Sequence, residues 1–311
     1  MRQNSAADRA RRLLAHLIFY TCALAFAQFT PAGMARVYAQ SGAPFDKGLL
    51  WRIEKAGSAP SHLFGTVHLA DARVTTLPDA VRDALNAARS FAMEVSLDQS
   101  NIATLAARMV YLDGRDLPGV AGAALFRKIV PLTAGLGMPA EMARLFKPWA
   151  MVLLLQMPPQ DASRVLDFVL HRMAVEQGKV LSYLESVEEQ VGAFEGMSDR
   201  EQVALLEHAV ETHHELKAQT EKMIQAYLQR DLRRMWEIGE SEIAQRPELR
   251  PLKQVFDQRL LYDRNTRMVE RMQPQLKAGA AFIAVGALHL YGDRGLLSLL
   301  ARDGYRVTRV Y

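Results

Sequence analysis

The chain has 311 residues, half of them hydrophobic, so it can bury one large core or one core with an elaborate insertion. Its formal net charge is +4, but residues 1–39 hold five of the 38 Lys and Arg residues and one of the 34 Asp and Glu residues. The remaining 33 basic and 33 acidic side chains balance, which argues against a nucleic-acid-binding protein. The single cysteine, Cys22, excludes a disulfide framework.

Residues 1–39 have the three-part pattern of a secretory signal peptide. Arginines precede an apolar run from Leu13 to Ala27, too short for a membrane span, and small residues end at Ala39. We expect cleavage after Ala39, with Ala27 as a second site, and a periplasmic or secreted mature chain. The alternative is an uncleaved anchor or a misassigned start codon. No later segment has 18 consecutive apolar residues, so no stable membrane insertion of the mature chain is expected.

Strand-like segments cluster near both ends of the remaining chain. Near the first end we expect paired strands at 49–53 and 62–66, a helix at 79–88 and a buried strand at 90–95. Near the other end we expect a strand at 281–287, a helix at 295–302 and an alternating strand at 305–310. The order strand, helix, strand occurs at both ends. This indicates a degenerate internal repeat.

The pattern between these ends is mostly helical. Capping-box spacings at Ser186/Glu189 and Ser198/Glu201 precede helical periodicity, and residues 180–184 favour one short strand. Apolar positions from Asp199 to about Gln229 predict one or two long helices.

We therefore predict an α/β fold with a mixed β-sheet core, built from both chain ends as a degenerate repeat, and a large, mostly helical insertion. After the signal peptide, residues 40–311 would form a single domain. Residues 40–98 and 279–311 would supply its core, and residues 99–278 the insertion. No low-complexity tract suggests a linker between independent domains.

Nearly the same five residues occur twice: Gly-Thr-Val-His-Leu at 65–69 and Gly-Ala-Leu-His-Leu at 286–290. Both copies close an apolar run, so His68 and His289 would lie at the carboxyl ends of equivalent strands, where sites in α/β sheets form. Imidazole is a common metal ligand and general base. The alternative is a pair of ordinary surface or hydrogen-bonded histidines.

Glu94 interrupts a segment that otherwise has the pattern of a buried strand. A buried carboxylate is costly unless it is paired or binds a metal, although Glu94 could instead face solvent at the strand end. Together with His68 and His289 it would complete a His/His/carboxylate set. Such a set suits Zn²⁺, Mn²⁺, Co²⁺ or Fe²⁺.

Arg264 and Asn265 lie at the centre of a helical segment and have two interpretations. Arg264 could bind a carboxylate or oxyanion and Asn265 could orient a substrate amide. The spacing alone favours an ordinary charged helix face on which Asp263 and Arg267 pair. Histidines at 208, 213 and 214 do not form a His-Glu-x-x-His motif, so we expect a solvated helix face there.

The chain resembles the TraB/GumN family, which includes the Tiki-type metalloproteases and is distantly related to erythromycin-esterase-like and ChaN-like proteins. The resemblance covers nearly the whole mature chain. Its landmarks in this sequence are residues 50–53, 63–68, 93–95, 184–190, 263–265, 285–290, 295–297 and 304–305. Each motif is weak alone, but their order and spacing together are specific.

The resemblance implies a fold in which two GxxH motifs converge on one site and, for Tiki-like members, Mn²⁺- or Co²⁺-dependent peptide cleavage. It gives His68, Glu94 and His289 a metal-binding role and Arg264 and Asn265 a catalytic or substrate-binding role, and Glu94 is a candidate catalytic residue as well. Glu185 also falls within a landmark, with a role that could be structural.

The leading hypothesis is a secreted or periplasmic metal-dependent hydrolase of the peptidase class, acting on a peptide or protein substrate. One alternative is a non-catalytic exported binding or regulatory protein for a peptide, a metal or haem. Another is a metal-free, esterase-like hydrolase with a histidine base. The sequence does not indicate the oligomeric state.

Overall fold

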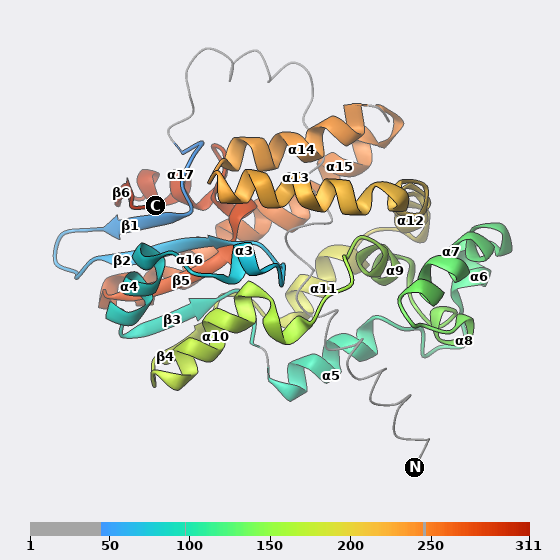
Figure 1. Ribbon diagram of the computed structural model, residues 1–311, viewed down its shortest axis with the longest axis horizontal. Helices are drawn as coiled ribbons and strands as arrows, with labels where there is room; N and C mark the ends of the chain where they lie inside the picture. The colour runs from blue at the N-terminus through green and yellow to red at the C-terminus, as the bar shows by residue number, and fades with distance from the viewer. Residues whose placement is uncertain (1–44, 97, 245–246) are drawn as a thin grey trace. The chain divides into compact units, whose positions relative to one another are not determined.

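The computed structural model describes residues 45–96, 98–244 and 247–311 (Figure 1). The predicted signal peptide and both of its candidate cleavage positions lie outside the described residues. In the part of the chain that is described, no helix is both long and apolar enough to cross a membrane.

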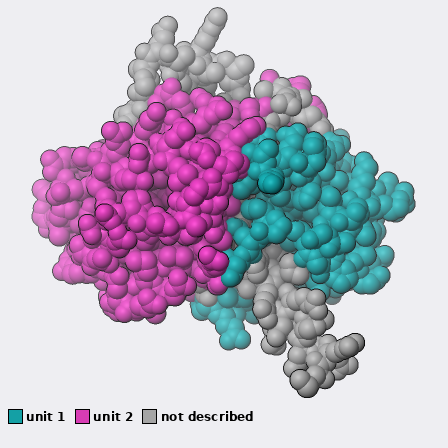
Figure 2. Space-filling model, in the orientation of Figure 1, with its two compact units in different colours: residues 1–25, 97–162, 187–220 teal, residues 26–96, 163–186, 221–311 magenta. Residues whose placement is uncertain are grey.

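The chain folds into two compact units that alternate along the sequence (Figure 2). The unit that contains the β-sheet, called the sheet unit below, consists of the described residues in 45–96, 163–186 and 221–311. The helical unit consists of residues 98–162 and 187–220. Much of the sequence between the two chain ends therefore folds with the sheet.

A six-stranded mixed sheet has the strand order β4-β3-β5-β2-β1-β6. Its strands are β1 (Leu50–Glu54), β2 (Ser61–Thr66), β3 (Ser90–Met93), β4 (Val180–Tyr183), β5 (Ala281–Gly286) and β6 (Arg306–Arg309). β1 pairs antiparallel with β2 and β6, whereas β2, β5, β3 and β4 form a parallel set. The predicted α/β class, with a mixed sheet supplied by both chain ends, is confirmed. β4 joins it from the middle of the chain.

The two chain ends share one order of elements, strand, helix, strand, although one strand separates β2 from β3 in the sheet and two strands separate β5 from β6. β2 leads through α3 (Ala72–Thr75) and α4 (Asp79–Ala87) to β3, and β5 leads through α17 (Leu296–Arg302) to β6. Because β1 is antiparallel to both β2 and β6, the strand that closes each repeat runs in the same direction as the strand that opens it.

The composition of β5 explains its central position. All six of its residues are buried, as expected of a parallel strand that is covered on both faces. The ring of Phe282 stacks on Phe91 of β3 at a centroid distance of 6.2 Å and lies 5.9 Å from Phe64 of β2. This aromatic cluster joins three neighbouring strands, whose carboxyl ends lie at one edge of the sheet.

The remaining helices of the sheet unit come from two segments of the chain. They are α10 (Leu166–Glu176), the end of α13 (Leu216–Leu228), α14 (Leu232–Ala244), α15 (Arg250–Asp257) and α16 (Asp263–Ala278), with 3₁₀ turns at Pro247–Leu249 and Ala287–Leu290. A π-helical turn, Gln258–Tyr262, joins α15 to α16. Single π turns inside helices are rare and often accompany functional residues.

The helical unit has an apolar helix among amphipathic ones. Its helices are α5 (Gln99–Arg108), α6 (Leu117–Ala121), α7 (Ala123–Gly135), α8 (Ala140–Ala143), α9 (Pro148–Leu155), α11 (Val187–Glu195) and α12 (Asp199–Thr212). Every residue of α9 is buried, and its Trp149 stacks on Phe194 of α11 at 5.3 Å. The predicted capping box of Ser198 and Glu201 begins α12, and a 3₁₀ turn at His213–Glu215 separates α12 from α13. Another such turn lies at Ala162–Arg164.

Candidate functional site

Three predicted site residues follow three neighbouring parallel strands of the sheet unit. His68 follows β2, Glu94 follows β3 and His289 follows β5, and all three side chains are buried. Because parallel strands end at the same edge of a sheet, the fold brings these residues, far apart in sequence, to one place. The Nε2 atom of His289 lies 3.9 Å from Oε1 of Glu94.

Gly65 allows the two GxxHL segments to pack directly against each other. A Cβ atom at position 65 would lie 2.8 Å from Cδ1 of Leu290 and 3.0 Å from the backbone Cα of Ala287. The Gly65 backbone is held by a hydrogen bond from the Tyr227 hydroxyl to its carbonyl, 2.9 Å, and by its own N–H bond to Leu49. The absence of a side chain here therefore serves contact between the repeats.

His68 is oriented by a buried carboxylate. Its Nδ1 lies 2.6 Å from Oδ2 of Asp167, and the Thr66 hydroxyl donates to Oδ1 of the same carboxylate at 2.7 Å. Asp167 stands in the first turn of α10, where the helix dipole favours negative charge. The Asp167 carboxylate accepts a hydrogen bond from Nδ1, so in the neutral ring Nε2 is the nitrogen that can act as a base or ligand.

The charge of Asp167 also decides the titration of His68. Burial alone would lower the pKa of His68, but the charge of Asp167 and the hydrogen bond to it outweigh burial and raise that pKa above its ordinary value. Glu94 acts in the same direction and Arg264 in the opposite one.

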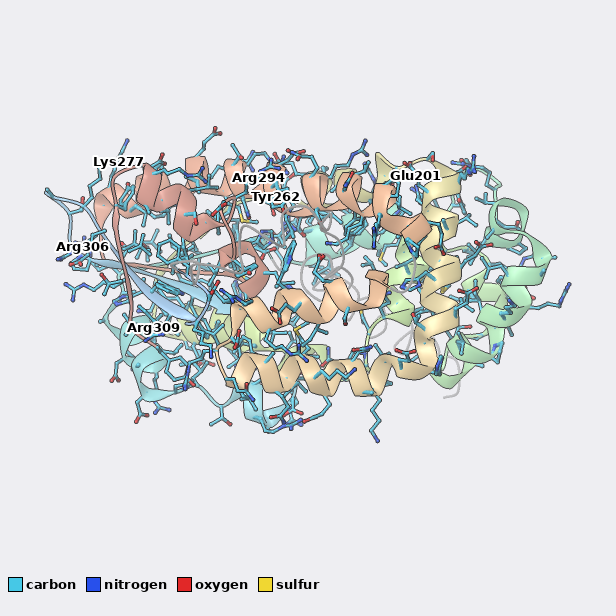
Figure 3. All side chains as sticks on the ribbon, turned by 90° about the horizontal axis from the view of Figure 1, so that it is seen from above. Glu201, Tyr262, Lys277, Arg294, Arg306 and Arg309 are labelled. Atoms are coloured by element: carbon cyan, nitrogen blue, oxygen red, sulfur yellow. The ribbon has the colours of Figure 1, made fainter. Side chains whose placement is uncertain are left out.

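His289 has a neutral partner instead. Its Nδ1 lies 2.6 Å from Oδ1 of Asn265, whose Nδ2 donates to the carbonyl of Arg294 at 2.8 Å. An amide oxygen only accepts, so Nδ1 of His289 carries the proton. The guanidinium of Arg294 stacks on the ring of Tyr262, 4.0 Å from its centroid (Figure 3). Arg294 therefore connects Tyr262, the last residue of the π turn, to Asn265, which holds His289.

The second histidine is neutral near pH 7. Burial, together with the positive charge of Arg264, lowers the pKa of His289 to about 3. Its Nε2 makes no hydrogen bond within the described residues although the side chain is 0% exposed. A buried polar atom without a hydrogen bond costs about 1–3 kcal/mol, so this nitrogen is a candidate ligand atom.

A buried guanidinium joins Glu94 to Glu185. Arg264 donates through Nε to both oxygens of Glu185 at 2.9 Å and through Nη2 to Oε2 of Glu94 at 2.8 Å. Its Nη1 donates to the carbonyl of Leu260 at 3.2 Å, and the backbone N–H of Gly286 donates to Oε1 of Glu94 at 2.7 Å. The ends of β3, β4 and β5 and the start of α16 are thus linked through one ionic network.

The charged-face interpretation of residues 263–267 is wrong. Arg264 and Asn265 are both buried, and Arg267 lies 3.4 Å from Glu185 rather than pairing with Asp263. Asp263 instead accepts a hydrogen bond from Gln258. Helical spacing could not show this because it does not indicate which face of α16 packs on the sheet.

The donors at this edge suit a divalent ion chemically. Both imidazoles have Nδ1 engaged by a side-chain oxygen, the arrangement that orients histidine ligands, and Glu94 adds a carboxylate. The 3.9 Å from His289 to Glu94 exceeds a hydrogen bond, while such ligands bind at roughly 2.0–2.2 Å, so one ion could contact both. As the side chains stand, no three His, Cys, Asp or Glu residues in the described ranges form a metal-holding group.

The sequence did not indicate Asp167, Thr66 or Tyr227 as functional residues. Asp167 could have been noticed as an acidic residue inside the apolar run 165–170, but acids are common in the first turn of a helix. Glu185 was noticed only through the family landmarks, and its contact with Arg264 shows what it holds.

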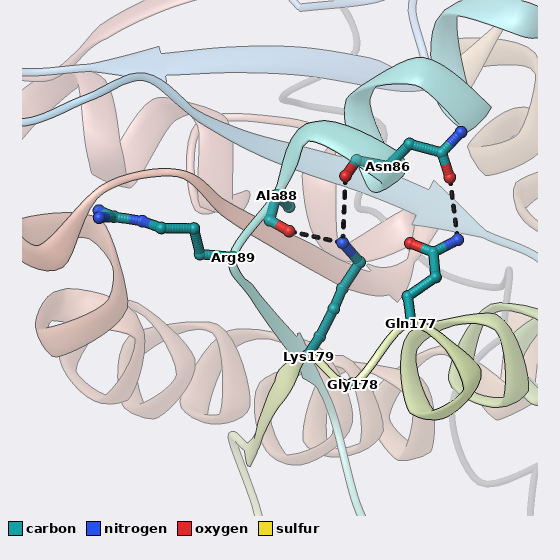
Figure 4. A pocket seen from close by; sticks show the side chains of 6 residues that line it. All are labelled: Asn86, Ala88, Arg89, Gln177, Gly178 and Lys179. Carbon is teal, nitrogen blue, oxygen red and sulfur yellow. Dashed lines mark hydrogen bonds between the residues drawn. The ribbon is translucent and has the colours of Figure 1, made fainter.

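A cavity of about 670 Å³ lies away from this site, where β3 and β4 begin (Figure 4). Its lining includes Lys179, whose Nζ donates to the carbonyls of Asn86 and Ala88, and Gln177, which donates to Asn86. Lys179 therefore satisfies carbonyls at the carboxyl end of α4. These contacts describe a structural clamp at the amino-terminal edge of the sheet.

Comparisons with known proteins add independent information. The model described as the TraB/PrgY/gumN family matches residues 49–309. Metalloprotease TIKI2 of Danio rerio is 26% identical, over 83% of this chain and 60% of that protein, and Metalloprotease TIKI2 of Xenopus tropicalis is 27% identical, over 83% and 59%. Metalloprotease TIKI1 of Danio rerio is 26% identical, over 83% and 62%.

The chain therefore spans about 60% of the length of these curated relatives. No solved structure gives a significant match. The comparisons confirm the resemblance seen in the sequence, and the relatives themselves are named metalloproteases.

Proposed function

We propose that this chain, which belongs to the TraB/PrgY/gumN family, is a metal-dependent peptidase. The observation that carries the proposal is the pair of buried imidazoles beside Glu94, each with its Nδ1 held by a side-chain oxygen. A structural histidine pair would not need both rings fixed in the same tautomer at the ends of neighbouring strands.

In this proposal His68, His289 and Glu94 hold a divalent ion. The donor atoms would be the two Nε2 atoms, which lie across each ring from the bonded Nδ1, and Oε1 of Glu94, which accepts one hydrogen bond from Gly286 and lies 3.9 Å from Nε2 of His289. When bound, the ion would supply Lewis-acid polarisation of a peptide carbonyl and acidification of water. Mn²⁺ or Co²⁺ is proposed from the family resemblance, and the donor set also suits Zn²⁺ or Fe²⁺.

The surrounding residues set the charge and orientation of these donors. Asp167 holds the proton on Nδ1 of His68, and Asn265 does the same for His289. Arg264 supplies positive charge opposite both Glu94 and Glu185. Since the contacts of Arg264 and Asn265 are with protein groups, these contacts favour a positioning role over direct contact with substrate.

We propose that the mature chain acts in the periplasm or outside the cell. The support is the signal-peptide pattern of residues 1–39, the balanced charge of the remaining chain and its lack of cysteine. Its substrate would be a peptide or protein.

One observation favours a second candidate, an exported binding or regulatory protein for a peptide, a metal or haem. Both oxygens of Glu94 accept hydrogen bonds, from Gly286 and Arg264, and no three acidic, histidine or cysteine side chains in the described ranges close into a metal-holding group. Such a protein would bind its ligand tightly and show no turnover.

The test is elemental analysis of purified mature protein, followed by peptidase assays with added Mn²⁺, Co²⁺ and Zn²⁺. His68→Ala and His289→Ala should each remove bound metal and turnover while the protein remains folded. His214→Ala is the control, because this exposed ring bonds only locally to the Glu211 carbonyl and its neighbour Glu215. Unchanged metal content in both site variants would refute the proposal. Activity that resists EDTA would favour the metal-free, esterase-like hydrolase.

A further inference from the structure

The two edges of the sheet are protected differently. The β6 edge has Arg306 and Arg309, and Arg306 pairs with Glu54 at 2.7 Å (Figure 3). Charged side chains on an edge strand discourage pairing with another chain. β4, at the opposite edge, has the uncharged sequence Val-Leu-Ser-Tyr, in which Val180 is 71% and Tyr183 36% exposed.

The backbone of β4 offers hydrogen-bonding groups on its free side. The N–H of Val180 donates to Arg89, and that of Leu184 donates to Met93, so these alternate residues face β3. Backbone groups alternate in direction along a strand, which turns the N–H and C=O of Leu181 and Tyr183 outward. No strand in the described ranges pairs with that side.

The unprotected edge leads directly into the candidate site. Two residues after β4, the N–H of Glu185 donates to the Glu94 carbonyl at 2.7 Å, and the Glu185 carboxylate holds Arg264. β6 pairs with β1, and β1, β2 and β5 lie between it and β3, the strand that leads to Glu94. The edge left open to pairing is therefore the one that runs to Glu94.

We propose that β4 is the docking edge for the peptide substrate, which adds to the sheet as an extended, uncharged strand. Backbone groups of Leu181 and Tyr183 would pair with it, and the exposed side chains of Val180 and Tyr183 would contact its apolar residues. This inference rests on the proposed peptidase function. It adds how the substrate is held and what sequence it prefers near the cleaved bond.

The spacing of strands sets a minimum substrate length. Neighbouring strands lie about 4.8 Å apart, so a strand added outside β4 is roughly 10 Å from β3 and 14 Å from β5. At about 3.3 Å per extended residue, three or four residues must extend past the paired segment to reach between Glu94 and His289. Substrates shorter than about six residues should therefore be cleaved poorly.

Amide hydrogen exchange tests docking separately from cleavage. The probe is an acetylated octapeptide of alternating valine and threonine with a carboxyl-terminal lysine, added to the mature, metal-supplemented protein. Exchange at Leu181 and Tyr183 should slow by about tenfold or more, while exchange at Arg306–Arg309 should not change. Val180→Lys should reduce the slowing of exchange at Leu181 and Tyr183, because a charged side chain on β4 would discourage strand pairing, as the arginines do on β6.

Kinetics supply the second measurement. Val180→Lys should raise KM for the octapeptide, and Leu181→Pro should raise it by roughly two- to tenfold, the effect of one hydrogen bond. Proline at 181 removes only an outward N–H and spares the ladder to β3. The matched control is Val310→Lys, the same change at a residue 44% exposed beside β6, which should leave KM unchanged.

Each outcome decides a different question. Cleavage of the octapeptide without protection of β4, and with the same KM in both variants, would overturn the docking edge but leave the peptidase proposal standing. Protection without cleavage would support docking and count against the peptidase. Neither protection nor cleavage would overturn both, and protection that needs no peptide but grows with protein concentration would show that a second copy occupies the edge instead.

Discussion

Gly65→Ala gives a direct test of how the two GxxHL segments meet. The added methyl group would lie 2.8 Å from Cδ1 of Leu290 and 3.0 Å from Cα of Ala287, whereas carbon atoms in contact lie about 3.5–4.0 Å apart. Leu290 can swing its side chain, but Ala287 can yield only if the backbone after β5 moves. Bonds to Leu49 and Tyr227 prevent position 65 from retreating.

Overpacking of this kind lowers the free energy of unfolding by about 1–3 kcal/mol. Each kcal/mol lost should lower Tm by roughly 2–4 °C in a chain of this size. Urea unfolding of metal-free protein measures the cost, and Mn²⁺ titration should also show weaker binding because the shift carries His289 away from His68. Gly192→Ala is the matched control. It lies inside α11 with no atom near the added methyl, so it should stabilise by about 0.5–1 kcal/mol. A Gly65→Ala protein as stable as the wild type would refute the packing argument.

Three further predictions concern the buried charges. Asp167→Asn should weaken Mn²⁺ binding about 10- to 100-fold, because His68 loses the carboxylate behind its Nδ1; calorimetric titration checks this, and unchanged affinity in folded protein would contradict it. Arg264→Met removes the principal cation beside the buried Glu185 and should lower the free energy of unfolding, measured with urea, by about 3–5 kcal/mol. A variant as stable as the wild type would contradict this. Metal-free protein should lose stability as pH falls from about 6.5 toward about 3, because the unfolded chain protonates His289 while the folded chain, with its lowered pKa, does not. Unfolding curves across that range should show a steeper loss in wild type than in His289→Asn, and equal slopes would count against it.

The parts of the fold that could be predicted are those with local signals. The apolar run of β5 and the repeated GxxHL segment can be recognised in the sequence, because a buried strand and the glycine near its end form a pattern within about ten residues. Glu94 could be selected because a carboxylate inside an apolar segment is costly. The helical pattern around residues 199–228 was also confirmed, as α12 and α13.

The partners of the site residues could not be predicted in the same way. Asp167 lies 99 positions from His68, and Glu185 lies 79 positions from Arg264, so their contacts depend on how α10, β4 and α16 are placed by the fold. A helix with charged residues on several faces does not reveal which of them will be buried. The family resemblance indicated Arg264 and Asn265 where spacing favoured the charged-face interpretation, because it reflects selection on tertiary contacts that local periodicity does not contain.

The repeat provides two equivalent histidines, and their partners make them unequal. Asp167 places a negative charge behind His68 and raises its pKa, whereas Asn265 offers His289 only a neutral oxygen, and burial with Arg264 lowers its pKa. A symmetric pair would compete for the same proton or ligand with the same strength. In the proposed peptidase, the unequal supports give one strongly donating imidazole and one weaker imidazole beside Glu94, so the two halves of the repeat contribute different chemistry to one site.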